Sequence, residues 1–367
     1  MPAPGGLTMS RFFTPTLAAL TPYTPGEQLA VADLVKLNAN ENPYPPAPGV
    51  AAAVAGTVAG LRLYSDLRQT KLTEAIARRC GVPASWVLCG NGSDENLLLA
   101  IRAFCDVDTP LAFADITYSF YPVLCNLLGV PARVLPLRED FTIDLSAYHR
   151  LGCTIVIANP NAPTSLLAPV AEIEAVVRTN PDHIVIVDEA YVDFAGPGAS
   201  CLPLVQKYDN LLVVRTFSKS RSLAGARLGF CIGQPGLIAD MNRVKFSYSP
   251  YNINSMSEAA GAAAMEDEDY FRRTVAAICE TRAAAAAGLR DRGWQVLDSA
   301  TNFLFARPPR RPAAEILEAL RRRRVLIRHF DAPRIRDWLR ISIGTPAQMQ
   351  RFFDALDEAE GAAPAAR

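Results

Sequence analysis

The chain has no excess of charge of either sign. Its 367 residues include 37 basic and 37 acidic side chains, so the formal net charge is zero. The longest run of like charge is the arginine stretch 321–324, on a predicted helix that also carries Glu315 and Glu318. We interpret this run as a solvated helix end. Because binding to nucleic acids and other polyanions depends on clustered cations, we do not predict such a partner.

Patterns for metals, disulfides and membranes are also missing. The eight cysteines form no Cys-x-x-Cys pair and lie mostly within apolar runs, which is typical of buried thiols in a reducing compartment. His149, His183 and His329 have no ligand partners at metal-site spacing, so we predict no metal. There is no signal-peptide pattern and no apolar stretch long enough to span a bilayer. We therefore expect a soluble cytoplasmic protein.

The order of apolar runs and amphipathic stretches predicts an α/β fold. Half of the residues are apolar, and the length exceeds that of one ordinary core, which favours a large domain and a smaller one. Short apolar strands alternate with helices through the middle of the chain, the pattern of a mostly parallel sheet covered on both faces. The predicted strands are 86–89, 111–114, 154–158, 184–187, 211–214 and 228–232, and the predicted helices include 94–105, 118–128 and 171–178.

The pattern changes after about residue 265. A long helix rich in alanine and arginine is predicted over 270–291. Short strands then alternate with helices, which indicates a smaller α+β unit. The predicted strands are 302–306, 325–327 and 338–343, and the predicted helices are 313–322 and 347–359.

Two motifs at strand ends predict a pyridoxal phosphate site. Lys219 closes the stretch Arg-Thr-Phe-Ser-Lys directly after an apolar strand, and Asp188 ends another apolar strand. A lysine amine in a dry pocket can stay neutral enough to bond to an aldehyde and to move a proton. An aspartate that faces a pyridine nitrogen keeps this nitrogen protonated, so that the ring can accept electrons. We assign these roles to Lys219 and Asp188.

Side chains around these motifs can hold the rest of the cofactor. Ser218 and Arg227 are expected to bind its phosphate, the arginine by charge-assisted hydrogen bonds. The turn before a predicted helix offers the backbone amides of Ser93 and Asp94 to the same phosphate. Tyr191 follows Asp188 by three residues and is expected near the hydroxyl oxygen of the ring.

These motifs resemble the class I/II, fold-type I aminotransferases, and among them the histidinol-phosphate aminotransferase family. Further matching stretches make the resemblance cover nearly the whole chain: 20–23, 36–44, 63–66, 90–95, 117–118, 159–165, 249–252, 301–303 and 339–345. The resemblance implies an N-terminal segment, 1–50, that packs on a small domain, 266–367, beside a large pyridoxal phosphate domain, 51–265. It also implies a homodimer with shared active sites.

The resemblance assigns further roles. It implies that Tyr118 stacks on the pyridine ring, and that Tyr64 reaches the cofactor phosphate in the neighbouring subunit. Arg340 matches the arginine that clamps the α-carboxylate of an amino acid. Tyr23 and Arg328 match positions that meet the phosphate of histidinol phosphate.

The opening segment and the stretch 159–165 bear on two more residues. Asn40, within the opening stretch 36–44, is expected to bind substrate. Relatives usually carry an asparagine, which bonds the ring hydroxyl oxygen, where this chain has Ala162. Either Asn161 takes over this bond, which we predict, or Tyr191 acts alone.

The expected reaction is transamination of histidinol phosphate with 2-oxoglutarate, which gives imidazole acetol phosphate and glutamate in histidine biosynthesis. Two other enzymes would keep Lys219 and Asp188: an aromatic or other amino-acid aminotransferase, and a phosphothreonine decarboxylase. A regulator of the same fold would need an appended DNA-binding domain, for which the chain has neither the residues nor the charge.

Overall fold

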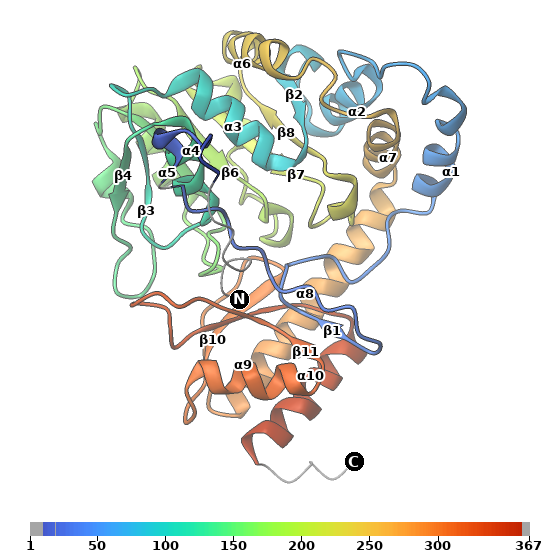
Figure 1. The fold of residues 1–367 in the computed structure, drawn as a ribbon, viewed down its shortest axis with the longest axis vertical. Helices are drawn as coiled ribbons and strands as arrows, with labels where there is room; N and C mark the ends of the chain where they lie inside the picture. Colours follow the sequence, from blue (N-terminus) through green and yellow to red (C-terminus); the bar gives the residue numbers. More distant parts are fainter. Residues whose placement is uncertain (1–9, 19, 362–367) are drawn as a thin grey trace.

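The structure is a computed structural model that describes residues 10–18 and 20–361. Two layered parts lie one above the other along its long axis (Figure 1). The larger part contains a sheet with strand order β2-β8-β7-β6-β5-β3-β4, and the smaller part a sheet with the order β12-β13-β10-β9. Among the described helices, none is both long and apolar enough to cross a membrane.

The large sheet is mostly parallel. Strands β4, β3, β5, β6 and β7 run in one direction, whereas β8 is antiparallel to both of its neighbours, β7 and β2. All strands except the edge strand β4 consist almost entirely of buried residues, as expected for a sheet covered on both faces. The strands are β2 Val87–Gly90, β3 Leu111–Ala114, β4 Ala132–Leu135, β5 Thr154–Ala158, β6 Val185–Asp188, β7 Leu211–Thr216 and β8 Gly229–Ile232.

Alternate residues of the buried strands face two separate cores, on opposite sides of the sheet. In β6, Val185 and Val187 pack with helices α1, α2, α5 and α7, whereas Ile186 faces α3, α4 and α6 on the other side. This alternation follows from the period of two of a β-strand. The helices are α1 Gly49–Ala55, α2 Thr70–Cys80, α3 Gly92–Phe104, α4 Phe120–Leu128, α5 Val170–Thr179, α6 Pro235–Tyr248 and α7 Ser255–Glu266.

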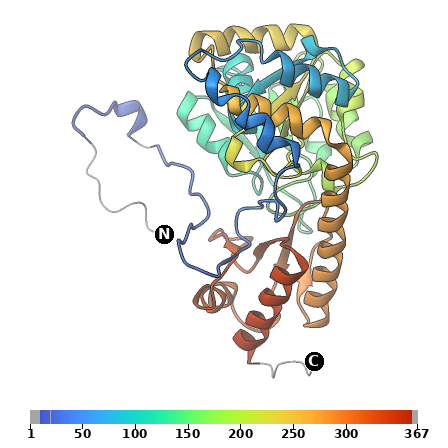
Figure 2. The same cartoon turned by 90° about the vertical axis from the view of Figure 1, so that its right-hand side faces the viewer.

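The small part has its own core. Helix α8, Glu268–Asp291, runs down from the large part and packs with α9 and α10 against the small sheet (Figures 1 and 2). The other elements are β9 Gln295–Val296, β10 Phe303–Arg307, α9 Ala313–Arg322, β11 Val325–Leu326, β12 Arg328–His329, β13 Leu339–Ser342 and α10 Pro346–Glu360. The predicted α/β class with a smaller α+β unit is therefore confirmed, although we did not predict β4, whose side chains are largely exposed.

The N-terminal segment is attached to the small part. Strand β1, Val35–Lys36, pairs in parallel with β11. Two side chains of the arginine run add to this attachment: Arg321 forms a bidentate ion pair with Glu27, and Arg324 donates to the carbonyl of Ala32 at 3.4 Å. The run is thus not simply a solvated helix end, because part of it binds the segment that enters the site.

The carboxyl ends of the parallel strands bring the predicted cofactor residues together. Asp188 ends β6, Thr216 ends β7, and the N-terminus of α3 lies beside them after β2. This position is where open α/β sheets bind ligands. The approach of α3 to β8 depends on Gly229, because a Cβ atom there would lie 2.3 Å from the backbone nitrogen of Ser93.

We predict that Gly229→Ala lowers the free energy of unfolding by about 2 kcal/mol or more, since two backbones would have to separate. Gly236 is the matched control. It lies in helix α6, and no atom lies within 4 Å of the place that a Cβ atom would take there, so that alanine costs nothing in packing and favours the helix. Urea unfolding followed by circular dichroism measures both changes. An equal midpoint for Gly229→Ala and the wild type would contradict the tight contact.

Candidate active site

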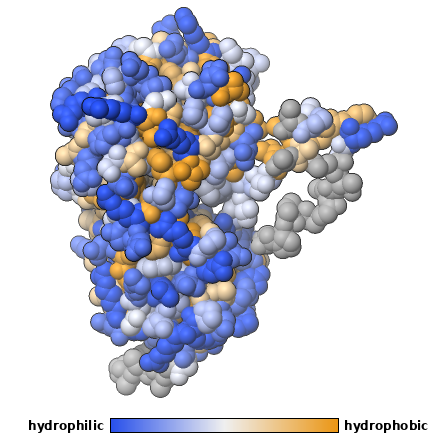
Figure 3. Space-filling view, turned by 90° about the vertical axis from the view of Figure 1, so that its left-hand side faces the viewer, coloured by the Kyte–Doolittle hydropathy of each residue, from blue (hydrophilic) through white to orange (hydrophobic). Residues whose placement is uncertain are grey.

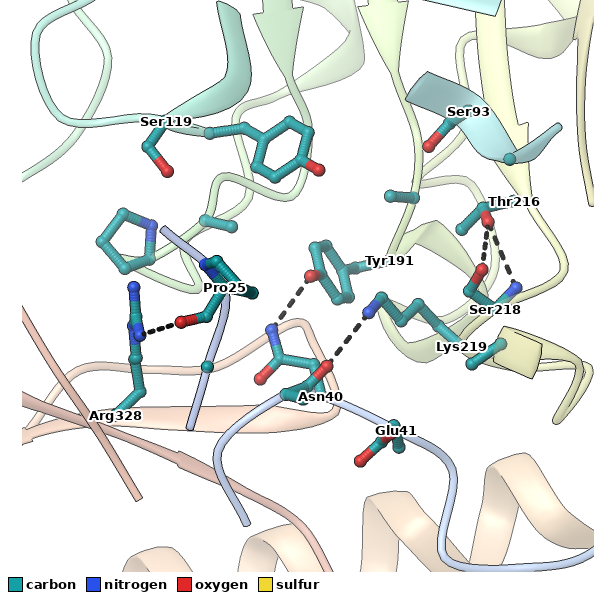
Figure 4. A pocket seen from close by; sticks show the side chains of 18 of the residues that line it. Pro25, Asn40, Glu41, Ser93, Ser119, Tyr191, Thr216, Ser218, Lys219 and Arg328 are labelled. Carbon is teal, nitrogen blue, oxygen red and sulfur yellow. Dashed lines mark hydrogen bonds between the residues drawn. The ribbon is translucent and has the colours of Figure 1, made fainter. Parts of the chain in front are cut away.

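A cavity of about 430 Å³ lies where the large part, the small part and the N-terminal segment meet. Lys219, Asp188 and Tyr191 line it from the large part, and Arg328 and Arg340 from the small part. Figure 4 shows Lys219 and Tyr191 at its centre, with Arg328 at one side and the pair Thr216 and Ser218 at the other. The cavity thus brings together residues far apart in the sequence.

The amine of Lys219 points into this cavity. Its Nζ atom donates a hydrogen bond to the carbonyl oxygen of Ala39 at 3.2 Å. Burial, followed by the positive charge of Arg340, lowers the pKa of Lys219 to about 8, while Glu41 acts in the opposite direction. A substantial fraction of the amine is therefore neutral near pH 8, which a nucleophile and proton acceptor requires.

Asp188 offers a buried anion on the wall of the same cavity. Its carboxylate accepts hydrogen bonds from the hydroxyl of Tyr121 at 2.9 Å and from the amide of Ala190 at 3.2 Å. Burial raises its pKa to about 6, although the bond from Tyr121 opposes this rise. A protonated ring nitrogen would supply the cation that this buried carboxylate lacks, so Asp188 fits the pyridine end of pyridoxal phosphate.

The other end of the cavity suits a phosphate. The hydroxyl groups of Thr216 and Ser218 are 3.0 Å apart, and helix α3 begins beside them with Ser93 and Asp94 in its first turn. Arg227 reaches the same place and pairs with Asp94 at 3.0 Å. Hydroxyls, a helix N-terminus and an arginine are groups that hold phosphates.

Thr216 lines this end, but we did not assign it from the sequence. It stands two residues before Ser218, and side chains at this spacing in a strand point to the same side. The spacing was therefore a usable signal. At the same end, Gly92 has a φ of 76°, and a Cβ atom there would lie 2.7 Å from a guanidinium nitrogen of Arg227, which ties this glycine to the position of the arginine.

Aromatic side chains form the wall next to Asp188. Tyr118 lines the cavity, and its hydroxyl donates to Asp94 at 2.9 Å. Its stacking on a pyridine ring stays a prediction. Tyr121, the donor to Asp188, packs edge-to-face on Tyr118 with a centroid distance of 5.6 Å. We did not assign Tyr121 from the sequence, although it stands only three residues after Tyr118, at the start of α4.

Tyr191 and Asn40 form a pair. The side-chain amide of Asn40 donates to the hydroxyl oxygen of Tyr191 at 2.9 Å, so the tyrosine proton is free to point elsewhere in the cavity. Burial raises the pKa of Tyr191. This hydroxyl therefore remains protonated at neutral pH and can act as a donor.

The geometry does not support our prediction for Asn161. Its amide nitrogen donates to Ile116 and Thr164, and its oxygen accepts from Thr117, so its side chain is fully engaged away from the cavity. Ala162 lines the cavity instead. A methyl group makes no hydrogen bond, which leaves Tyr191 as the candidate donor to a ring hydroxyl oxygen.

The small part contributes two arginines that flank one aromatic ring. The guanidinium carbons of Arg328 and Arg340 each lie 5.4 Å from the centre of Phe330, and Arg340 is equally close to Phe303. Arg340 donates to the carbonyl of Asn38, but its buried Nε atom has no hydrogen-bond partner. An incoming anion would satisfy this donor.

Arg328 and Tyr23 lie where the N-terminal segment closes the cavity. The guanidinium of Arg328 donates to the carbonyl oxygens of Pro25 and Thr24 at 3.0 and 2.9 Å. Tyr23 also lines the cavity and packs on Tyr118 with a centroid distance of 6.3 Å. The N-terminal segment is thus a wall of the site.

Tyr64 lies outside the cavity of its own chain. Its side chain is 83% exposed and stacks on Tyr251 at a centroid distance of 4.4 Å. This tyrosine is not among the residues that line the phosphate end within its own chain.

Comparisons with known proteins agree with this geometry. Residues 32–356 match the family model "Aminotransferase class I and II". The chain is 48% identical to "Histidinol-phosphate aminotransferase 2" of Dechloromonas aromatica over 96% of its own length and 100% of the relative's. It is also 48% identical to "Histidinol-phosphate aminotransferase 1" of Bradyrhizobium diazoefficiens, over 95% of this chain and 99% of the relative.

A solved structure is similar over the same extent. Histidinol-phosphate aminotransferase from Sinorhizobium meliloti, in complex with pyridoxal-5'-phosphate, has a TM-score of 0.85 and 25% sequence identity, and the match covers 96% of this chain and 98% of that one. In the present chain, the surroundings of Asp188 and the phosphate end of the cavity fit the same cofactor.

We predict that covalent attachment of pyridoxal phosphate to the cofactor-free protein accelerates as the pH rises through about 8, the pKa of Lys219, because the neutral amine is the reactive form. Removing the charge of Arg340 by Arg340→Met should raise this pKa and move the profile to higher pH. Absorbance during rapid mixing measures both, with Lys219→Ala as the control that shows no attachment. An unchanged profile in Arg340→Met would contradict the assigned electrostatics.

Proposed function

The chain belongs to the family of class I and II aminotransferases, and on this basis we propose that it transfers the amino group of histidinol phosphate to 2-oxoglutarate. The observation that carries the choice of substrate is the pair of arginines, Arg328 and Arg340, around Phe330. Figure 4 shows Arg328 at the side of the cavity away from Thr216 and Ser218. The cofactor phosphate would bind at one end of the cavity and a substrate anion at the other. The reacting atoms would then lie in the space between them. The names of the two relatives support the same donor.

Pyridoxal phosphate supplies an electron-accepting ring that makes the hydrogen on the donor's α-carbon acidic. Lys219 removes this proton through its neutral Nζ atom, which lies next to the carbonyl of Ala39. Asp188 stabilises positive charge at the ring nitrogen, and Tyr121 holds the carboxylate in place. Ser93, Asp94, Thr216, Ser218 and Arg227 line one end of the cavity and would hold the cofactor phosphate.

The two cationic groups of the small part serve two different substrates in turn. Histidinol phosphate carries a phosphate, which we assign to Arg328 and Tyr23, whereas 2-oxoglutarate and glutamate carry carboxylates, one of which we assign to Arg340. Asn40 contacts the substrate from the N-terminal side. Because one cavity receives both substrates, product leaves before the second substrate binds, and the kinetics are ping-pong. We place the reaction in the cytoplasm, in keeping with the free cysteines.

We expect a catalytic efficiency for histidinol phosphate at least about tenfold above that for phenylalanine or tyrosine, since a second anion-binding group favours a donor that carries a phosphate. For phosphothreonine, which also carries a phosphate, we expect the same margin on the basis of the names of the relatives. A coupled assay of glutamate formation from 2-oxoglutarate measures this ratio, and Lys219→Ala is the inactive control. Preference for an aromatic amino acid would retain the mechanism and refute the donor. Release of carbon dioxide from phosphothreonine would instead identify a decarboxylase.

We also propose a homodimer in which each subunit completes its partner's site. Exposed apolar side chains gather around Tyr64 and Tyr251, including Leu61, Leu63 and Tyr248. Phe12 and Phe13 are likewise exposed, on an N-terminal segment that stands off the body of the molecule in two views (Figures 2 and 3). A second copy would cover such surfaces and bring Tyr64 to a neighbouring phosphate end.

Mixing two inactive variants tests this sharing. A mixed dimer of Tyr64→Ala and Lys219→Ala subunits contains one site with both wild-type residues, so equal mixing should restore about a quarter of wild-type activity. The activity after verified subunit exchange is compared with that of each variant alone. No recovery would show that Tyr64 does not act across the interface.

A further inference from the structure

The N-terminal segment contacts Lys219 at both ends of this residue. At the side chain, the carbonyl oxygen of Ala39 accepts the hydrogen bond from the amine at 3.2 Å. At the backbone, the side-chain amide of Asn42 donates to the carbonyl oxygen of Lys219 at 3.0 Å. Two residues that are three positions apart in the sequence therefore hold the amine and the main chain of the same lysine.

Asn42 is fully engaged in this arrangement. Its amide nitrogen also donates to the carbonyl of Ser220 at 3.2 Å, and its oxygen accepts from the backbone amide of Tyr44 at 3.0 Å. The nitrogen thus faces two successive carbonyls of the turn that carries Lys219, whereas the oxygen faces its own segment. The nitrogen and the oxygen of this one side chain therefore bind two different segments of the chain.

The turn after Lys219 is closed by the backbone amide of Leu223, which donates to the carbonyl of Phe217 at 3.0 Å, but the carbonyl of Lys219 itself is only weakly bonded within the turn. The backbone amide of Ser222 approaches the carbonyl of Lys219 at 3.5 Å, which is long for a hydrogen bond, and Ser222 has a φ of 58°. A lysine side chain has four rotatable bonds, so the place of its amine depends on how firmly its backbone is held. The bonds from Asn42 fill this need.

The same segment is anchored to the small part. The backbone nitrogen of Asn40 donates to the hydroxyl of Ser342 at 2.8 Å, and the side-chain amide of Asn302 donates to the carbonyl of Asn40 at 2.9 Å. Both partners are buried. Residues 39–42 therefore connect the substrate-binding part of the molecule to the turn of Lys219.

We propose that Asn42 is a positioning residue, which sets the place of the Lys219 amine by holding the lysine turn to the N-terminal segment. Asn42 does not touch the reacting atoms. It acts through the two backbone carbonyls that it binds. The inference rests on the proposed aminotransfer for its kinetic test, but not for its structural test.

Two variants separate the contacts of Asn42. Asn42→Ala removes all of them, whereas Asn42→Asp keeps the acceptor for Tyr44 and loses both donors to the lysine turn. Asn210→Ala is the matched control. The side-chain amide of Asn210, like that of Asn42, donates to backbone carbonyls, three in this case, but Asn210 stands directly before the first residue of β7, at the end away from Lys219. This substitution should lower the free energy of unfolding without changing the position of Lys219.

The first measurement is hydrogen exchange of the segment 217–223 in cofactor-free protein. Both Asn42 variants should increase its exchange rate about tenfold, the effect of losing two modest hydrogen bonds, and Asn210→Ala should leave it unchanged. Slow exchange in both Asn42 variants would overturn the proposal. Faster exchange in Asn42→Ala alone would overturn it as well, because the effect would then come from the contact with Tyr44.

The second measurement separates kcat from KM on the loaded enzyme. Both Asn42 variants should lower kcat about tenfold with KM changed less than about threefold, since misplacing a proton-transfer group affects the chemical step. A selective rise of KM would contradict positioning of Lys219. A wild-type enzyme inactive on histidinol phosphate would refute the proposed donor, while the exchange measurement would still decide the role of Asn42.

Discussion

The exclusion of water around one lysine amine is the condition on which the site depends. Burial lowers the pKa of Lys219 to about 8, and the nearby guanidinium of Arg340 acts in the same direction. The same burial raises the pKa of Asp188 to about 6. In this cavity, burial disfavours the charged form of both the lysine amine and the aspartate carboxylate. A bound cofactor would offer each of them an interaction partner in a place from which water is excluded.

The architecture divides the chemistry between two parts. Rigid strand ends of the large sheet hold Asp188 and Thr216, which suits a cofactor that stays in place. The small sheet and the N-terminal segment hold Arg340, Arg328 and Tyr23, which suits substrates that come and go. Because separate cores stabilise the two parts, the substrate side can vary among relatives without disturbing the cofactor side.

The N-terminal segment has a larger role than a covering arm. Its residues 38–42 contact Arg340, Lys219 and Tyr191 through backbone carbonyls and asparagine side chains. Asparagine suits this place, because one short side chain can donate and accept at the same time without adding charge beside the lysine. Arg340, Lys219 and Tyr191, for which we propose three different roles, are thus connected through one short stretch of chain.

Much of this protein could be determined from its sequence alone. The α/β class, most strands of the large sheet and the candidate roles proposed for Lys219 and Asp188 follow from local signals: apolar runs of strand length, and reactive side chains at their ends. The exposed strand β4 was not predictable in this way, since it lacks the apolar run. Thr216 and Tyr121 carried usable spacing signals, because each lies two or three residues from a residue that we assigned.

Only the tertiary structure decided the rest. It turned Asn161 away from the cavity, because three partners distant in sequence or across a turn saturate its amide, and it left Ala162 in the lining. It also joined Asn42 to Lys219 across a separation of 177 residues. Sequence patterns report which side chains are chemically able to act, whereas the folded chain sets which of their hydrogen bonds are already occupied, since that depends on neighbours that no local pattern contains.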